Sequence, residues 1–205
     1  MHLNWLGQTC VKLQTKNQDE DVVIILDAYR PKEGDFPRNL APQIALFSHG
    51  AEDVVTMAQN TFVVDTLGEL EIKAVMIYAM PGSDGNIIFK INAEGMNIVH
   101  LGKITKKIEN GDLEKLSGPD ILFIPVGGNS EYLDAETAAK LVTTLEPRIV
   151  IPMGYQCDTD PTAGTLTDFI KEMGLKPENT EKKVIIKKRD LPQDETKIIV
   201  LEKNY

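Results

Sequence analysis

The sequence has few of the residues that most often bind transition metals, because its 205 residues include only three histidines and two cysteines. Imidazoles and thiolates are the preferred ligands of zinc, so any zinc site has few candidates to draw on. The two cysteines, Cys10 and Cys157, lie far apart, in segments typical of a strand and of a loop. This spacing excludes a zinc knuckle and a redox dithiol motif, and we expect both thiols to be reduced.

Long hydrophobic runs are also absent, and residues 1–7 show no basic region followed by an apolar stretch. No segment approaches the length of a membrane span. Basic residues are in the minority, since 31 acidic residues outnumber 22 basic ones and give a net charge of -9. A chain with this charge repels polyanions, which excludes nucleic acid as an expected partner. We therefore predict a cytoplasmic protein with no membrane contact, whose partner is a small molecule or another protein.

What the chain does contain is the composition of an ordinary soluble domain, with 42% hydrophobic and 26% charged residues. It has no internal repeat, low-complexity linker or change in composition along its length. A chain of this size can bury one core of packed sheets and helices. The sequence thus predicts a single domain over residues 1–205.

Short β-rich runs, each bounded by turn-forming residues, fill the first two-thirds of the chain. Residues 87–100 are typical of a hairpin, in which Asn92 to Gly95 supply the turn and Gly95 takes the positive φ angle. Consecutive antiparallel strands are expected in this part. The predicted strands are 10–13, 22–26, 44–47, 61–64, 72–78, 87–91 and 96–101.

After Gly102 strands alternate with helices. The continuously apolar runs at 120–126 and 148–153 indicate strands that are covered on both faces. A helix is predicted at about 134–145 with Asp134 as its cap, and another at about 165–173 that ends at Gly174. Strands at 184–187 and 197–201 close the chain. This order predicts the α/β class and an α/β/β/α sandwich, with two mixed sheets packed face to face and helices outside.

Four short motifs follow one another in the sequence. They are the stretches 5–10 (WLGQTC), 25–29 (ILDAY), 120–128 (a strand ending in PVGG) and 149–155 (IVIPMGY). In this order they resemble the metallo-β-lactamase superfamily, in particular its small bacterial ascorbate-phosphate-lactonase-like branch. The resemblance runs from Trp5 to the last strand. It implies the same sandwich fold and a pair of divalent ions, usually zinc, that activate a hydroxide for hydrolysis.

Most residues that would hold this metal pair are replaced. The family has a His-x-His-x-Asp-His run, and the matching stretch here keeps His49 and Asp53 but has Ala51 and Val54 in place of two histidines. The resemblance therefore implies a site that has lost part of its first ligand cluster.

Three further ligand positions differ as well. In the loop before the central hairpin, Asp84 occupies the region where the family has a histidine. Lys103 follows His-Leu-Gly where the family has a bridging aspartate, and Gly154 follows Ile-Pro-Met where the family has a late histidine. An ammonium among divalent ions is repelled by about 1–4 kcal/mol per charge even when well screened.

These replacements predict a degenerate metal site without a cofactor. His2 stands at the terminus, where fraying is expected, and His100 matches a position beside the family's ligands. His49 and Asp53 remain, and one weakly bound divalent ion such as zinc at these two residues is the alternative. We further expect Lys103 to pair with a partly buried Asp53, or else to face water.

Two functional readings follow from the sequence. The first is a non-catalytic pseudoenzyme, a binding or regulatory protein with a remnant pocket. The second is a metal-dependent hydrolase of a small ester, lactone or phosphorylated substrate that uses a reduced or rearranged site. The sequence favours the first, because the chemistry depends on the ligands more than the fold does. The predicted pocket consists of His49, Asp53, Asp84, Lys103 and Gly154.

Overall fold

The computed structural model describes residues 1–17, 20–108, 110–178 and 180–205, except for the side chain of residue 110. The helices are α1 (Asn110–Leu116), α2 (Ala135–Leu145) and α3 (Leu166–Met173), with 3-10 turns η1 (Ser83–Gly85) and η2 (Lys188–Asp190). The strands are β1 (His2–Gly7), β2 (Cys10–Asn17), β3 (Glu20–Leu26), β4 (Asn39–Leu40), β5 (Ile44–Leu46), β6 (Thr56–Met57), β7 (Phe62–Val64), β8 (Gly68–Ile72), β9 (Val75–Pro81), β10 (Ile87–Ala93), β11 (Met96–His100), β12 (Ile121–Pro125), β13 (Ile149–Met153), β14 (Thr180–Glu181), β15 (Val184–Ile185), β16 (Lys197–Ile198) and β17 (Val200–Leu201).

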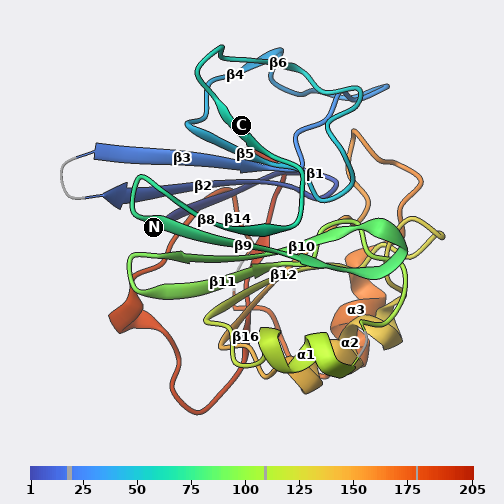
Figure 1. Cartoon of the computed structure of the whole chain (residues 1–205). Coiled ribbons are helices and arrows are strands. Elements are labelled where there is room, and N and C mark those ends of the chain that lie inside the picture. Colours follow the sequence, from blue (N-terminus) through green and yellow to red (C-terminus); the bar gives the residue numbers. More distant parts are fainter. Residues whose placement is uncertain (18–19, 109, 179) are drawn as a thin grey trace.

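Two mixed sheets pack face to face, with helices outside (Figure 1), which confirms the predicted architecture. The first sheet has the order β15-β1-β2-β3-β5-β7, and the second has the order β16-β13-β12-β11-β10-β9-β8. The pairs β4–β6 and β14–β17 form two small additional sheets. Both large sheets combine parallel and antiparallel neighbours, so their strand ends meet at shared edges where loops can form a site.

The main core lies between the two sheets. Alternate residues of β2 and β3 point into it, as expected for strands with one buried face. Every residue of β12 and β13 is buried, because the second sheet contacts the first sheet on one face and the helices on the other. The continuously apolar runs that predicted these two strands therefore reflect this double coverage.

All three α-helices lie against the outer face of the second sheet (Figure 1). The Asp134 carboxylate accepts a hydrogen bond from the Thr137 N–H at 2.8 Å and caps α2, while Gly174 ends α3 with a φ of 64°. Both predicted caps are confirmed. The outer face of the first sheet is covered instead by the irregular segment that carries β4 and β6 (Figure 1).

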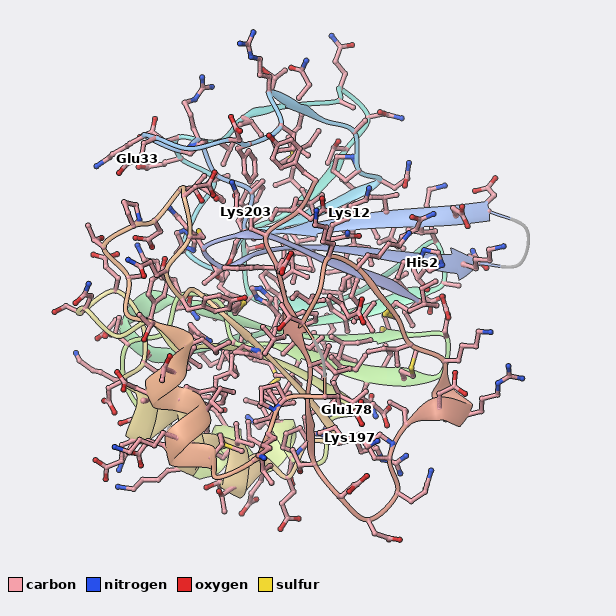
Figure 2. All side chains as sticks on the ribbon, turned by 180° about the vertical axis from the view of Figure 1, so that it is seen from behind. His2, Lys12, Glu33, Glu178, Lys197 and Lys203 are labelled. Carbon is pink, nitrogen blue, oxygen red and sulfur yellow. The ribbon has the colours of Figure 1, made fainter. Side chains whose placement is uncertain are left out.

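The C-terminal segment runs over the back of the molecule. Lys203 forms a backbone bridge beside Trp5, and Lys197 pairs with Glu178 (Figure 2). Among the described residues, no helix has both the length and the apolar character needed to cross a membrane.

Three local expectations were wrong, and one helix was not predicted. The predicted strand 72–78 is interrupted by a hairpin turn, because Lys73 and Ala74 have φ angles of 51° and 56° and separate β8 from β9, so that only residues 75–78 of it belong to one strand. His2 is not frayed, since it lies in β1 between β2 and β15. Strands β3, β5 and β7 run parallel rather than antiparallel. Helix α1 carried no signal that we recognised.

Candidate functional site

The site begins where two parallel strands of the first sheet end. Asp27 follows β3 and Ser48 lies two residues after β5, and because these strands are parallel neighbours their ends meet. The buried Asp27 carboxylate accepts hydrogen bonds from the Ser48 N–H at 2.6 Å and from the Ser48 hydroxyl at 2.7 Å. Both oxygens of this carboxylate are thus bound to a single residue.

His49 extends this pair toward the surface. Its Nδ1 atom lies 3.0 Å from the Ser48 hydroxyl oxygen and 3.8 Å from Asp27 Oδ1. Because the Ser48 hydroxyl donates its proton to Asp27, the Nδ1–H of His49 is the group that donates to Ser48. In the neutral ring this arrangement leaves the lone pair on Nε2, in a side chain that is 41% exposed. His49 therefore offers one basic nitrogen to a ligand.

His100, at the end of β11, is buried and serves the structure. Its Nε2–H donates to the Thr9 carbonyl oxygen at 2.9 Å, and its Nδ1 accepts from the Gly102 N–H at 3.2 Å. Burial lowers the pKa of His100. The nearby Asp27 carboxylate acts in the opposite direction but does not cancel the effect of burial. Both ring nitrogens are occupied by backbone groups, so His100 has no free donor for a metal.

Asn86, directly before β10, is hydrogen-bonded to the loop after β11. Its amide donates to the Leu101 carbonyl at 2.9 Å, and its carbonyl accepts from the Lys103 N–H at 3.1 Å. Gly102 touches Ser48 so closely that a Cβ atom there would lie 2.4 Å from Ser48 Oγ. Lys103 and His49 are the residues that follow these two contacting residues in the sequence.

Gly154, after β13, is covered by an aromatic ring. Its φ angle is 63°, and a Cβ atom at this position would lie 2.9 Å from Cδ1 and 3.0 Å from Cε1 of Tyr132. The Tyr132 hydroxyl donates to Asp160 Oδ2 at 2.7 Å, which holds the ring in place. Burial raises the pKa of Tyr132. The ring therefore fills the space into which a side chain at position 154 would project.

We had expected Lys103 to pair with Asp53, but it does not. Its ammonium forms an ion pair with Glu131, with side chains that are 33% and 59% exposed respectively. Asp53 is exposed instead of partly buried, so it does not need a counter-charge. Water can solvate the Asp53 carboxylate, whose assumed burial was the reason for expecting the pair.

Asp53 and Asp84 lie apart from the buried part of the site. Asp53 has a φ angle of 52° in a surface turn, and its backbone carbonyl accepts from the Arg30 N–H at 2.7 Å. The exposed Asp84 carboxylate accepts from the Lys106 ammonium at 2.9 Å and from the Thr105 hydroxyl at 3.0 Å, and these bonds lower its pKa. Among the described side chains, no hydrogen bond or ion pair joins either aspartate to His49.

These side chains do not form a set of metal ligands. Over residues 1–17, 20–108, 110–178 and 180–205, no group of three or more His, Cys, Asp or Glu side chains is placed to hold a metal ion. A catalytic zinc needs three protein ligands, and a pair of ions needs more. The residues present therefore do not fit the metal pair that the sequence resemblance implies.

Besides Ser48, which directly precedes His49, four members of the site were missed from sequence, namely Asp27, Asn86, Glu131 and Tyr132. Asp27 carried a usable signal, because a single carboxylate directly after a buried strand needs a partner at the strand end. The other three act through contacts with residues that are remote in sequence, such as Gly154 and Lys103. No local pattern indicates such contacts.

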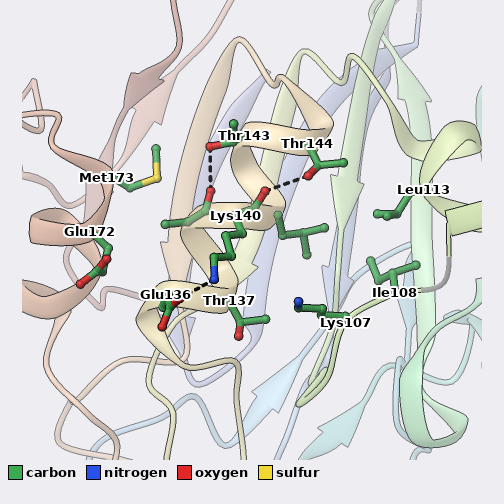
Figure 3. Close-up of a pocket in the computed structure, with 12 residues that line it drawn as sticks. Lys107, Ile108, Leu113, Glu136, Thr137, Lys140, Thr143, Thr144, Glu172 and Met173 are labelled. Carbon is green, nitrogen blue, oxygen red and sulfur yellow. Dashed lines mark hydrogen bonds and ion pairs between the residues drawn. The ribbon is translucent and has the colours of Figure 1, made fainter.

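A hollow of about 740 Å³ lies elsewhere, among the three helices (Figure 3). Ile108, Leu113 and Met173 supply apolar lining, while Lys107 and Glu172 stand at its border. It shares no residue with the site around His49, so it does not enlarge that site.

Comparison with known proteins places the chain among hydrolase relatives. Residues 2–154 match the family model described as a beta-lactamase superfamily domain. A UPF0173 metal-dependent hydrolase from Thermococcus onnurineus is 27% identical over 187 residues, which cover 84% of this chain and 83% of that protein. Another from Methanopyrus kandleri is 21% identical over 198 residues, covering 76% and 84%.

Solved structures share the fold. A metallo-beta-lactamase superfamily protein from Thermotoga maritima aligns with a TM-score of 0.80 at 23% identity and covers 98% of both chains. The isothiocyanate hydrolase from Delia radicum gut bacteria aligns with a TM-score of 0.62 at 11% identity, covering 100% of this chain and 98% of that one. At these identities the likeness concerns the fold alone.

Proposed function

Because this chain belongs to the metallo-β-lactamase superfamily, we propose that it is a hydrolase homologue that binds a ligand without the metal pair. In this proposal the sandwich is kept as a scaffold, and the site around His49 has a binding or regulatory role. The partner is a small molecule or a protein that contacts the surface between His49 and Lys103.

The occupied donors support this proposal. Both carboxylate oxygens of Asp27 accept hydrogen bonds from Ser48, and both ring nitrogens of His100 are hydrogen-bonded to backbone groups. The ring of Tyr132 closes the space beside Gly154, where the resemblance would place a further ligand. A second metal would have to displace these contacts, each of which is worth about 0.5–1.5 kcal/mol.

A metal-dependent hydrolase with a reduced site is the second candidate, and one observation favours it. The Asp27–Ser48–His49 chain orients His49 so that its basic Nε2 is available to a ligand or a proton. The curated relatives named above are described as metal-dependent hydrolases, which is consistent with this candidate. Its substrate would be a small ester, lactone or phosphorylated molecule.

Elemental analysis of protein purified without chelator separates the two candidates. Our proposal predicts zinc, manganese and iron well below stoichiometric amounts, and an unchanged melting temperature when zinc is added. A bound ion would instead raise the melting temperature by mass action. The variant His49→Ala removes the available nitrogen, and Glu52→Ala, an exposed change in the same loop, is the matched control.

Activity measurements complete the test. Wild type and both variants are assayed with p-nitrophenyl acetate and bis-p-nitrophenyl phosphate, with and without added zinc. Near-stoichiometric metal that is lost in His49→Ala but kept in Glu52→Ala would reject the metal-free proposal. Metal-dependent turnover with the same pattern would establish the second candidate.

A further inference from the structure

The first sheet has two free edges. Its strand order leaves β15 at one edge and β7 at the other, and no further strand pairs with either edge in the described part of the chain. A free edge strand presents unpaired N–H and C=O groups that can bind another chain. Natural sheets usually protect such edges, so the residues found there are informative.

The β7 edge is apolar and exposed. Phe62 and Val63 are each 47% exposed, and Leu67, just beyond the strand, is 58% exposed. These are three of the six large exposed hydrophobic side chains among the described residues, and they lie within six positions of one another. Such clustering is typical of an interaction surface.

The backbone of β7 is oriented for pairing. The Phe62 N–H donates to the Gln43 carbonyl at 2.9 Å, and the Val64 carbonyl accepts from the Phe47 N–H at 2.9 Å. In a parallel ladder, residues 62 and 64 therefore bond toward β5, and Val63 directs its N–H and C=O away from the sheet. The charged residues in 62–72 are the acidic Asp65, Glu69 and Glu71, and the first basic residue after them, Lys73, is paired with Glu20 at 3.3 Å.

The β15 edge has the complementary character. Ile185 is 55% exposed and pairs with His2 of β1, which is labelled in Figure 2. Met1 and Ile186 exchange backbone hydrogen bonds of 3.0 Å, so the neighbouring pair Ile185–His2 is a non-bonded one, and Ile185 directs its N–H and C=O outward. The exposed charged residues around it are mainly basic, since Lys182, Lys183, Lys187, Lys188 and Arg189 outnumber the acidic Glu181 and Asp190, of which Asp190 pairs with Arg189 at 3.5 Å.

We propose that the basic β15 edge of one copy of this chain binds the acidic β7 edge of a second copy, which extends the first sheet head to tail. Opposite charges meet in this arrangement, and Ile185 packs near Phe62 and Val63. Pairing of two β7 edges would bring the acidic residues together, and pairing of two β15 edges would bring the lysines together. Each like-charged arrangement is disfavoured.

The geometry also sets the form and strength of the assembly. A head-to-tail contact leaves one edge of each kind free, so it leads to a ring or to an open chain of copies. The paired segments are short, so we expect a weak and concentration-dependent contact. Because the charges are exposed, salt should weaken it, given a screening length of about 8 Å at physiological ionic strength.

Sedimentation velocity of the full chain over a concentration series tests the proposal. Wild type should associate at low salt and dissociate at high salt. Val63→Lys blocks only the β7 edge and Ile185→Glu blocks only the β15 edge, so each variant alone should remain monomeric. A mixture of the two variants still contains one intact edge of each kind and should form a one-to-one dimer and nothing larger.

Two controls make the outcome decisive. Leu175→Glu, a change at an exposed apolar residue away from both edges, should associate like wild type. Lys182→Glu combined with Lys183→Glu leaves the core untouched and should abolish association even if an edge variant fails to fold. A wild-type protein that stays monomeric at low salt, an Ile185→Glu variant that associates like wild type, or a mixture that stays monomeric would each overturn the proposal.

Discussion

Replacing Gly154 by alanine tests whether the chain has closed the space that the sequence resemblance assigns to a metal ligand. The φ angle of 63° costs a residue with a Cβ atom about 1–2 kcal/mol. The added Cβ would also lie 2.9 Å from Cδ1 and 3.0 Å from Cε1 of Tyr132, and such crowding costs about 1–3 kcal/mol. We therefore expect Gly154→Ala to lower the free energy of unfolding by roughly 2–5 kcal/mol.

A double-mutant cycle with Tyr132→Ala separates the two contributions. Tyr132→Ala alone should destabilise the protein by about 3–5 kcal/mol, because a buried ring is lost. In that background the crowding disappears, so Gly154→Ala should cost only the backbone part of about 1–2 kcal/mol. Urea denaturation followed by the fluorescence of the single tryptophan, Trp5, which is 1% exposed, measures all four proteins.

The cycle can fail in an informative way. Additivity of the two changes within about 0.5 kcal/mol would show that the ring does not close the space beside Gly154. A Gly154→His variant that is as stable as wild type and gains stability from zinc would refute the reasoning more directly. Either result would remove one of the supports for the metal-free proposal.

Three further predictions concern charged and buried groups. Because burial lowers the pKa of His100 below 6.5, the free energy of unfolding should fall as the pH drops below that value, by up to about 1.4 kcal/mol per pH unit. Unfolding measurements at several pH values should show a shallower pH dependence for His100→Gln. Glu94→Gln should lower the free energy of unfolding by about 1–3 kcal/mol at neutral pH, since the carboxylate accepts a 2.8 Å bond from the Met1 ammonium. Burial alone would raise the pKa of Glu94, but its hydrogen bonds lower it below 4.5, so its contribution is present above that pH and is lost as the pH falls through the lowered value; an unchanged difference at acid pH would contradict this. Lys103→Ala should change stability by less than about 1 kcal/mol, because its ion pair with Glu131 is largely exposed, and a larger loss in the same assay would contradict this assignment.

Patterns with a strong local cause were predictable from sequence. The apolar runs of β12 and β13, the Asp134 cap and the Gly174 end of α3 each follow from the physics of a few neighbouring residues. The turn between β8 and β9 was missed because Lys73 and Ala74 adopt positive φ angles, where glycine or asparagine is expected. The register of that hairpin is set by pairing across the sheet and leaves no sign in the turn itself.

The site was harder to predict than the fold. His49 was identified because its position in the resemblance is specific, but its partners Asp27 and Ser48 come from the ends of two parallel strands. The expected pairing of Lys103 with Asp53 rested on an assumed burial of the aspartate, and burial depends on the whole fold. Sequence reasoning thus proposed His49, Lys103 and Gly154 as site residues but could not assign their contacts.

The internal hydrogen bonds of the site constrain which ligands it can accept. A ligand that enters the buried part must break bonds to Asp27, His100 or Asn86, and each buried group left unpaired costs about 1–3 kcal/mol. A ligand that approaches His49 from its exposed side breaks none of them. Gly102 packs on Ser48, so the backbone of Lys103 follows a residue in contact with the one that precedes His49, while the Lys103 ammonium pairs with Glu131. Our proposal therefore predicts that a ligand binds at the exposed side of His49 and not in the buried part of the site.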